Sequence, residues 1–256
     1  MKICSVGALS AIPKEGNVDE PLKCPDMKTK NKMWLYLLLS LGLVLILNNC
    51  KKTQENTSGS ITDKDGNVYT SVTIGTQVWM VQNLKTTKLN DGNPIPDIID
   101  NIAWTSLTTP AYCWYNNDAA TYKSVYGALY NWYAVNVGNL CPTGWRVSTD
   151  NDCLLLEDYL GGATLAGSKM KETGTVHWTA PNSDATNETG FTALPGGYRT
   201  AAGQFDNIND YGFWWTSTIN PASNDPWFRR LQYDSGKSYR YYYDENYGMS
   251  VRCIKN

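Results

Sequence analysis

The stretch LCPTGWRVSTDNDCLLLEDYLGG, residues 140–162, carries the clearest run of structural signals in the chain. Residues 140–147 have the character of a strand or an extended connection. Ser148, Thr149 and Asp150 follow, and side chains of these types accept hydrogen bonds from the free N–H groups at the start of a helix. Gly161 and Gly162 close the helix, because glycine readily adopts the left-handed backbone at a helix end. The stretch therefore predicts an extended segment that leads into a capped helix over 151–160.

The chain before this stretch predicts hairpin strands, a loop and one more helix. Residues 61–81 contain alternating apolar positions and two turn signals, Asp65-Gly66-Asn67 and Gly75-Thr76, as a β-hairpin requires. Asp63 and Asp65 resemble the start of a calcium loop, but no glutamate follows at the required distance, and a plain turn is favoured. Residues 88–121 are rich in Pro, Asn, Asp and Thr and predict a loop. Residues 124–135 place apolar side chains at helical spacing.

After Gly162 the sequence predicts only short strands and turns. A hairpin, two helices and then many short strands indicate an α+β fold, because an alternating α/β fold interleaves its strands and helices. We therefore expect two short helices with short antiparallel strands and long loops.

Near the N-terminus, residues 27–52 read MKTKNKMWLYLLLSLGLVLILNNCKK. A basic head, an uncharged run over 33–47 and then Cys50 are typical of a bacterial lipoprotein signal. The run is shorter than the roughly 20 residues that a transmembrane helix needs. Asn49 departs from the small residue usual before the cysteine, so an uncleaved anchor is the alternative, and either outcome tethers the chain to a membrane.

This signal sets the expected domain organisation. Residues 27–50 are the signal peptide, with lipid on Cys50, and residues 1–26 are a gene-model artefact or a disordered leader. Residues 51–60 are a polar, flexible tether, and residues 61–256 form one domain. We expect the protein in the cell envelope, as an outer-membrane or cell-surface lipoprotein.

Composition narrows the classes of partner. The formal net charge is −2, so the chain has no excess of basic residues to bind phosphates, and nucleic acid is not an expected partner. The 10 Trp and 17 Tyr greatly outnumber the 4 Phe. Trp and Tyr combine an apolar ring with a polar group, so they suit surfaces that are partly buried and partly hydrated. The same residues also form cross-strand pairs in a β-rich core.

The cysteines of the expected domain are compatible with disulfides. Cys113, Cys141, Cys153 and Cys253 are an even number in a domain expected outside the cytoplasm. Four cysteines allow three pairings, and their spacing does not choose among them.

The sequence contains no catalytic or metal-binding constellation. His177 is the only histidine, and there is no Gly-x-Ser-x-Gly motif to accompany it, no histidine pair for zinc and no Cys-x-x-Cys. We expect a loop histidine packed beside Trp178, no catalytic residue, no metal and no cofactor.

Seven collinear stretches carry a resemblance to a known family: IGTQVWMVQNL (74–84), YCWYNND (112–118), YGALYNWYAV (126–135), LCPTGWRVSTD (140–150), GFTALPGGYRT (190–200), YGFWWTST (211–218) and YGMSVRCIKN (247–256). In these the chain resembles the Fibrobacter succinogenes major paralogous domain family. Residues 144–152 and 248–253 are more distantly similar to C-type-lectin-like domains and formylglycine-generating enzymes. That similarity implies a C-type-lectin-like fold and a Cys141–Cys253 disulfide, whereas the catalytic cysteines and calcium-binding triplets of those families are not matched.

These observations lead us to expect a membrane-tethered, extracytoplasmic and non-catalytic module that binds a glycan or another surface polymer. A structural envelope protein without a small-molecule ligand is the alternative, and an enzyme on a formylglycine-generating-enzyme-like fold is a third. Exposure of the strand face that carries residues 239, 241 and 243 separates the first from the second. The candidate ligand contacts are aromatic and basic residues near the C-terminus: Trp214, Trp215, Trp227, Arg229, Tyr239, Tyr241 and Tyr243.

Overall fold

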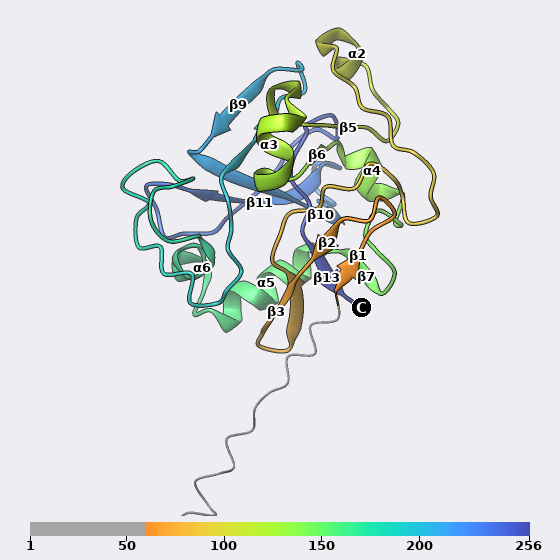
Figure 1. Cartoon of the computed structure of the whole chain (residues 1–256). Helices are drawn as coiled ribbons and strands as arrows, with labels where there is room; N and C mark the ends of the chain where they lie inside the picture. Colours follow the sequence, from red (N-terminus) through yellow and green to blue (C-terminus); the bar gives the residue numbers. More distant parts are fainter. Residues whose placement is uncertain (1–59) are drawn as a thin grey trace, which may run out of the picture. The chain divides into compact units, whose positions relative to one another are not determined.

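The computed structural model describes residues 60–256, coloured in Figure 1. The expected leader, the signal with Cys50 and nearly all of the tether lie outside the described residues. In order along the chain, the strands are β1 (Ile61–Thr62), β2 (Val68–Tyr69), β3 (Ser71–Ile74), β4 (Gln77–Met80), β5 (Tyr112–Cys113), β6 (Leu129–Tyr130), β7 (Trp145–Val147), β8 (Gly196–Arg199), β9 (Phe205–Ile208), β10 (Tyr211–Ile219), β11 (Pro226–Gln232), β12 (Tyr239–Tyr242) and β13 (Cys253–Lys255). The helices are α2 (Asn101–Thr105), α3 (Ala119–Tyr126), α4 (Trp132–Asn136), α5 (Asp150–Tyr159) and α6 (Ala163–Met170), with a 3-10 turn η1 (Tyr115–Asn117).

Two sheets organise these elements. The larger has the strand order β12-β11-β10-β8-β9, and all its neighbours are antiparallel except β10 and β8. The smaller has the order β3-β4-β13-β7. A bridge between Trp214 of β10 and Ser250, just before β13, links the two sheets. The strands are short and joined by long loops, and the α+β class is as the sequence predicts.

The stretch 140–162 folds as its sequence predicts. It forms β7 and then α5, whose N-cap is Thr149. Thr149 and Asp152 form a capping box, in which each side chain bonds the other residue's backbone N–H. Gly161 and Gly162 end the helix with φ of 94° and 99°. These signals are all local in the chain, so the sequence alone identifies them.

The helix predicted over 124–135 is wrong. α3 starts earlier, at Ala119, and ends at Gly127, which has φ of 76°. The short strand β6 follows and α4 then begins after its N-cap, Asn131. The tertiary reason is that Tyr130 pairs its backbone with Met249, and this contact extends the chain where local periodicity favours a helix.

The predicted number of helices is also wrong, since the described residues contain five rather than two. α6 follows directly after the two glycines, although Gly162 offers no side-chain cap, so the glycine pair gave no sign of a second helix. The predicted loop 88–121 contains α2, which the Asp100 side chain caps, and the strand β5.

The hairpin signals at 61–81 are confirmed as two hairpins, β1–β2 and β3–β4. In the first turn the Asp63 carboxylate accepts hydrogen bonds from the backbone of Asp65 and Asn67 and from the Tyr69 hydroxyl. The aspartate is therefore engaged within its own turn, in agreement with the prediction of a plain turn.

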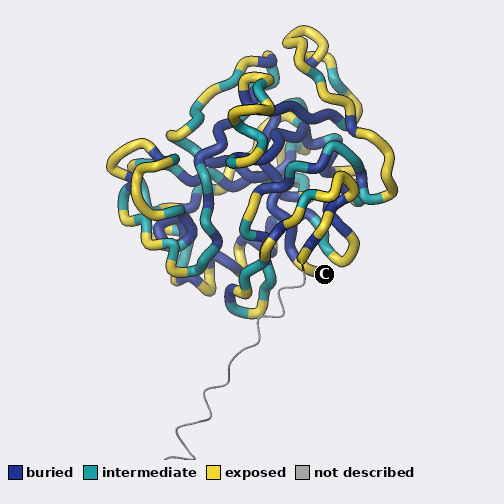
Figure 2. The backbone as a smooth tube through the Cα atoms, viewed as in Figure 1, coloured by how far each residue is buried: buried dark blue, intermediate teal, exposed yellow. Residues whose placement is uncertain are grey.

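The core is aromatic and one disulfide crosses it. Tyr130, Trp132, Trp215 and Phe228 are at most 2% exposed and belong to its main cluster. Figure 2 shows buried backbone, in dark blue, through the middle of the described domain. Cys141 and Cys253 form a disulfide, the pair that the resemblance implies. Cys113 and Cys153 are free and buried. Among residues 60–256, none of the helices combines the length and the hydropathy needed to cross a bilayer.

Candidate binding surface

One face of the five-stranded sheet gathers six tyrosines. Cross-strand pairing places Tyr241 opposite Phe228 and Tyr239 opposite Arg230, so these side chains share a face with Arg230. The same face continues across β10 and β8 to the loop before β13. We call this set the tyrosine surface: Tyr198, Tyr211, Arg230, Tyr239, Tyr241, Tyr243 and Tyr247.

Arg230 holds the rings at one end of the tyrosine surface. The carbon at the centre of its guanidinium lies 4.8 Å from the ring centres of both Tyr239 and Tyr241, and 5.1 Å from that of Tyr211. Its Nη2 donates to Gln232 Oε1 at 2.9 Å. Tyr239 and Tyr241 are nearly parallel, with an interplanar angle of 9°. Cation–π attraction to several rings at once restricts the guanidinium and the tyrosines together.

A second stack extends the tyrosine surface. Tyr247 lies between Tyr243, at 4.6 Å between ring centres, and Tyr198, at 5.9 Å. Tyr243 also packs 4.9 Å from buried Phe228. Burial raises the pKa of both Tyr198 and Tyr247, so both hydroxyls stay protonated at neutral pH and can donate hydrogen bonds.

The face with residues 239, 241 and 243 is neither fully exposed nor fully buried. Tyr241 and Tyr243 are 39% and 41% exposed, and Tyr239 is half-buried. Tyr241 and Tyr243 each pack one part of the ring against buried Phe228 and leave another part to solvent. Such rings can contact a ligand without leaving their positions in the sheet.

Three of the candidate contacts are core residues, and for them the sequence prediction is wrong. Trp215 is fully buried and its Nε1 donates to the Tyr130 carbonyl. Trp214 is also buried, with its Nε1 on Asn83 Oδ1. The buried Arg229 pairs with Asp150 and Glu157 of α5 at 2.8 Å each. All three face the packed interior and are not available to a ligand.

Trp227 lies on the opposite face of β11 from the tyrosine surface, since it pairs with Tyr242 and not with Tyr241. The Arg240 guanidinium stacks 3.5 Å from its ring centre, and Tyr242 packs edge-on at 5.3 Å. Trp227 and Tyr241 therefore cannot contact the same ligand ring.

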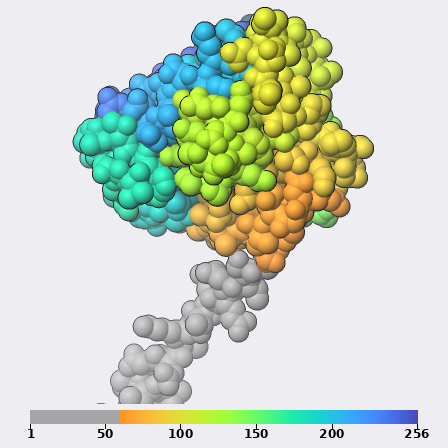
Figure 3. All heavy atoms as spheres, turned by 45° about the horizontal axis from the view of Figure 1, so that its top comes forward, coloured from red at the N-terminus to blue at the C-terminus, as the bar shows by residue number. Residues whose placement is uncertain are grey.

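A polar groove of about 600 Å³ opens where five segments meet. Tyr133 of α4 and Thr105 at the end of α2 line it, together with three loops. Figure 3 shows the α2 region, in yellow, against the blue residues around β9. Burial and the neighbouring Glu245 carboxylate raise the pKa of Tyr133 to about 12, so its hydroxyl stays protonated. The loops contribute Ala201, Ala202, Ser223, Asn224, Asp225, Asp244, Glu245 and Asn246.

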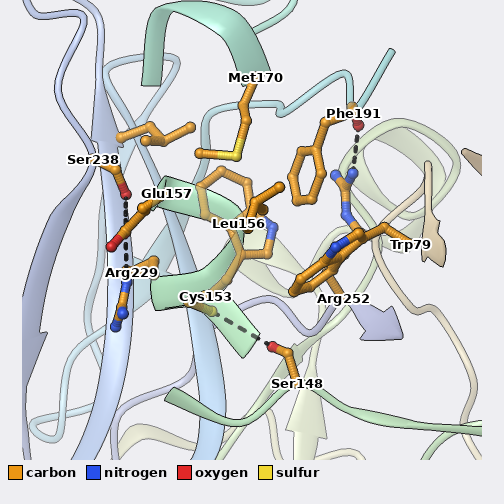
Figure 4. A pocket seen from close by; sticks show the side chains of 12 residues that line it. Trp79, Ser148, Cys153, Leu156, Glu157, Met170, Phe191, Arg229, Ser238 and Arg252 are labelled. Atoms are coloured by element: carbon orange, nitrogen blue, oxygen red, sulfur yellow. Dashed lines mark hydrogen bonds and ion pairs between the residues drawn. The ribbon is translucent and has the colours of Figure 1, made fainter. Parts of the chain in front are cut away.

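A second cavity lies inside the core between α5, α6 and the sheets (Figure 4). Its volume is about 30 Å³, and apolar side chains such as Trp79, Leu156, Met170 and Phe191 surround it. This space accommodates at most one or two waters. Cys153 lines it, but burial raises the pKa of its thiol to about 11, which keeps the sulfur unreactive. The cavity is a packing defect and not a ligand site.

His177 is half-buried and pairs with Glu172, with 2.8 Å between Nδ1 and Oε2. Its ring packs edge-on against Tyr126, 5.8 Å away. Within the described range 60–256, no group of three or more His, Cys, Asp or Glu residues is arranged to hold a metal ion.

The sequence reasoning missed Arg230, Tyr198, Tyr211, Tyr247 and the groove. Arg229 and Arg230 are adjacent and chemically identical, so only the register of β11 determines which one points outward. Alternation along β11 gave no usable signal, because Phe228 shares the face of Arg230 and is itself buried in the core. No sequence signal indicated the groove, because its lining comes from segments that are distant in the chain.

The chain matches a known family model. The family model described as Fibrobacter succinogenes major domain matches residues 72–255. No curated protein and no solved structure matches the chain.

Proposed function

The chain belongs to the Fibrobacter succinogenes major domain family, and from that premise we propose that it is a non-catalytic module that binds a glycan through the tyrosine surface. The family description names no activity, so the proposal stands on the surface itself. The observation that carries it is the set of partly exposed tyrosines which Arg230 and ring stacking hold on one sheet face.

Physical chemistry connects such a surface with sugars. The apolar face of a pyranose stacks on an aromatic ring, and by analogy with base stacking each ring contributes about 1 to 2 kcal/mol. The hydroxyls of the tyrosines and the Gln232 amide add hydrogen-bonding partners at the edges of the rings. Because the rings are already packed, binding costs little conformational entropy.

Binding of neutral oligosaccharides to the full chain in detergent micelles tests the proposal. We expect Tyr241→Ala and Tyr243→Ala each to weaken binding about 5- to 30-fold, from the loss of one stacking ring. The matched control is Tyr159→Ala, which removes a 66% exposed tyrosine from α5, outside the tyrosine surface. Isothermal titration calorimetry measures the affinities, and equal loss in the control and the test variants would contradict the proposal.

Two alternatives predict different results in the same experiment. A structural envelope protein without a ligand binds no oligosaccharide at any concentration tested. An enzyme cleaves the oligosaccharide, and chromatography of the incubated sample then shows shorter products. A bound and intact oligosaccharide distinguishes the proposed module from both.

We also propose that the chain is an extracytoplasmic lipoprotein, tethered to the envelope through Cys50. Support comes from the basic head, the short apolar run over 33–47 and the cysteine that follows. Tethered display of many copies multiplies weak contacts, which suits a module with shallow stacking sites. Metabolic labelling with an alkyne fatty acid is expected to tag the protein and to fail for Cys50→Ser. Labelling that persists in the Cys50→Ser variant would refute the assignment of this cysteine.

For the fold, we propose the C-type-lectin-like class. Two features support this proposal. The disulfide joins the segment before β7 to the last strand, and that last strand pairs between β4 and β7. A solved structure of the chain that superimposes on such domains along its whole length tests it.

A further inference from the structure

We propose that the tyrosine surface binds acidic glycans, with the carboxylate of a uronic acid held by Arg230 and Lys237. This inference rests on the proposed function and names its ligand class. It assigns the stacking of sugar rings to the tyrosines, and the choice between acidic and neutral sugars to two cations that lie against the same tyrosines.

Arg230 carries a positive charge that no ion pair neutralises. The side chain is partly exposed, and among residues 60–256 no carboxylate forms an ion pair with it. The tyrosine rings beside it attract its charge, but a ring has no net charge and cannot cancel it. An anionic ligand can supply the missing partner.

The other arginines of the described chain are engaged. Arg146 and Arg240 also reach solvent, but each of them pairs with an aspartate of α5. The remaining three arginines are buried, and they donate to carboxylates or to backbone carbonyls. Among residues 60–256, Arg230 is therefore the one arginine that combines exposure to solvent with an unpaired charge.

One nitrogen of the Arg230 guanidinium is left for a ligand. Nη2 donates to Gln232 Oε1 at 2.9 Å and, more weakly, to the Tyr241 hydroxyl at 3.4 Å. Nε is buried without a partner, whereas Nη1 is not buried and has no partner among residues 60–256. A charged N–H group binds a carboxylate oxygen more strongly than it binds a neutral oxygen. Nη1 is therefore the donor that favours an acidic sugar.

Lys237 supplies a second cation at the same end of the tyrosine surface. Its Nζ lies 5.0 Å from the ring centre of Tyr239, the ring that the Arg230 guanidinium contacts at 4.8 Å. Lys237 is exposed and forms no ion pair within the described chain. Asp234 accepts a hydrogen bond from the Gln232 amide at 2.7 Å, so this amide stands between its carboxylate and Arg230.

The acidic side chains Asp206 and Asp244 lie beside the other end of the tyrosine surface. Asp206 is the cross-strand partner of Tyr198, and Asp244 directly follows Tyr243 in the chain. The Phe213 ring lies between those of Tyr198 and Tyr211, at 4.6 Å from the first and 6.0 Å from the second. The tyrosine surface therefore has a cationic end at Arg230, and a carboxylate of the ligand binds there.

A uronic acid suits this arrangement because its carboxyl group is bonded directly to the sugar ring. A sugar stacked on Tyr239 or Tyr241 therefore brings its carboxylate close to the cations that contact these two rings. A neutral sugar stacks on the same rings but leaves the charges unpaired. An amino sugar would set a like charge beside two cations and would be repelled.

Calorimetry of the full chain in non-ionic detergent micelles tests the inference with two probes of equal length. These are the α-1,4-linked galacturonate tetramer and its fully methyl-esterified form, which keeps the sugar rings but carries no charge. We expect the acidic tetramer to bind at least about 10-fold more tightly than the ester, and this preference to shrink as salt is raised.

Two variants locate the source of the preference. Arg230→Gln should reduce it to about 2- to 5-fold, the part that Lys237 supplies. Because Arg230 also holds the tyrosine rings, its effect is read from the ratio of the two affinities, which a change in ring packing alone leaves unaltered. Lys237→Met should weaken the acidic tetramer about 2- to 5-fold and leave the ester unchanged. The matched control, Lys123→Met, removes a lysine whose Nζ lies 5.1 Å from the Trp114 ring centre, outside the tyrosine surface, and should change neither affinity.

The outcomes separate the inference from the proposed function. If the wild type binds both tetramers equally and Tyr241→Ala weakens both, the proposed function stands and the inference is overturned. A preference that persists in full in Arg230→Gln also overturns the inference. If Arg230→Gln reduces the preference but Tyr241→Ala changes neither affinity, the contact with the carboxylate stands and the stacking is wrong. If neither tetramer binds, both are wrong. Circular dichroism of each variant, expected to match the wild type, shows that its fold is intact.

Discussion

Among residues 60–256, several buried cations form no ion pair with a carboxylate. The Lys171 ammonium is fully buried and donates to the carbonyls of Ser183, Gln232 and Ser235. Arg199 and Arg252, also buried, likewise bond backbone carbonyls and asparagine side chains. Most of these carbonyls lie in loops, and the Gln232 carbonyl lies at the end of β11. Single residues thus hold the long loops in place.

Lys171 predicts a pH dependence of stability. Burial lowers its pKa to about 8, below the value of about 10.4 in an unfolded chain. Between these two pH values the unfolded chain binds more protons than the folded chain. The free energy of unfolding therefore rises as pH increases from about 8 to about 10.4, and it is lowest below pH 8, where the buried ammonium is charged. From pH 7.5 to 9.5 we expect the wild type to gain about 1 to 2 kcal/mol relative to Lys171→Met in urea unfolding.

The control for this prediction is Lys169→Met, which removes a lysine paired with Glu188 at the surface. Its stability should follow the wild-type pH profile. The measurement stops at pH 9.5 so that tyrosine ionisation does not interfere. Burial raises the pKa of Tyr112 and Tyr126 to about 12, so their contribution to the free energy of unfolding changes only above about pH 10. Parallel profiles for the wild type and Lys171→Met would show that Lys171 keeps its ordinary titration.

At the scale of elements, the break between α3, β6 and α4 controls the middle of the chain. Gly127 ends α3 with a positive φ and lies against the irregular segment just after β4, at Asn83 and Leu84. Ala128 then donates to the Leu84 carbonyl, and Tyr130 pairs with Met249. This glycine allows a segment with helical periodicity to run as a strand through the core.

Gly127→Ala is expected to be strongly destabilising. A Cβ at this position would lie 2.7 Å from the Leu84 carbonyl oxygen and 2.9 Å from the Asn83 Cβ, in addition to the backbone strain. Gly138→Ala provides the matched control, because Gly138 also has positive φ but no atom within 4 Å of its Cβ position. We expect the control to lose about 1 to 2 kcal/mol from the backbone term alone. Gly127→Ala should lose at least about 2 kcal/mol more in thermal or urea unfolding, and similar losses would contradict the packing argument.

At the scale of the whole molecule, the disulfide and β13 connect the ends of the domain. Cys253 begins β13, which pairs with β4 from the start of the domain and with β7 from its middle. The bond between Cys141 and Cys253 closes a loop with a sequence separation of 112. A long loop loses much entropy in the unfolded chain when it is closed.

Removing this bond should therefore cost stability without changing the fold's topology. We expect the Cys141→Ser, Cys253→Ser double variant to lose up to about 4 to 5 kcal/mol of unfolding free energy. Alkylation of the folded wild type, followed by peptide mapping, should leave Cys113 and Cys153 unmodified, because both are buried. Alkylation of Cys141 or Cys253 in the folded and unreduced protein would show that the bond does not form in solution.

The sequence by itself determined the elements whose signals are local. The Thr149 cap, the terminal glycines of α5 and the turns at Gly66 and Gly75 all act within a few residues, so their neighbours in the chain are their neighbours in space. The α+β class followed from the order of such elements.

Only the tertiary structure decided which faces are exposed. Arg229 and Arg230 differ by one position in β11, and the sheet register buries the first and presents the second to the tyrosines. Likewise, Trp214 and Trp215 are buried because helices and loops cover both faces of β10, which a short aromatic run does not reveal. The groove exists only where Thr105, Tyr133 and three loops meet, because long-range packing brings these distant segments together.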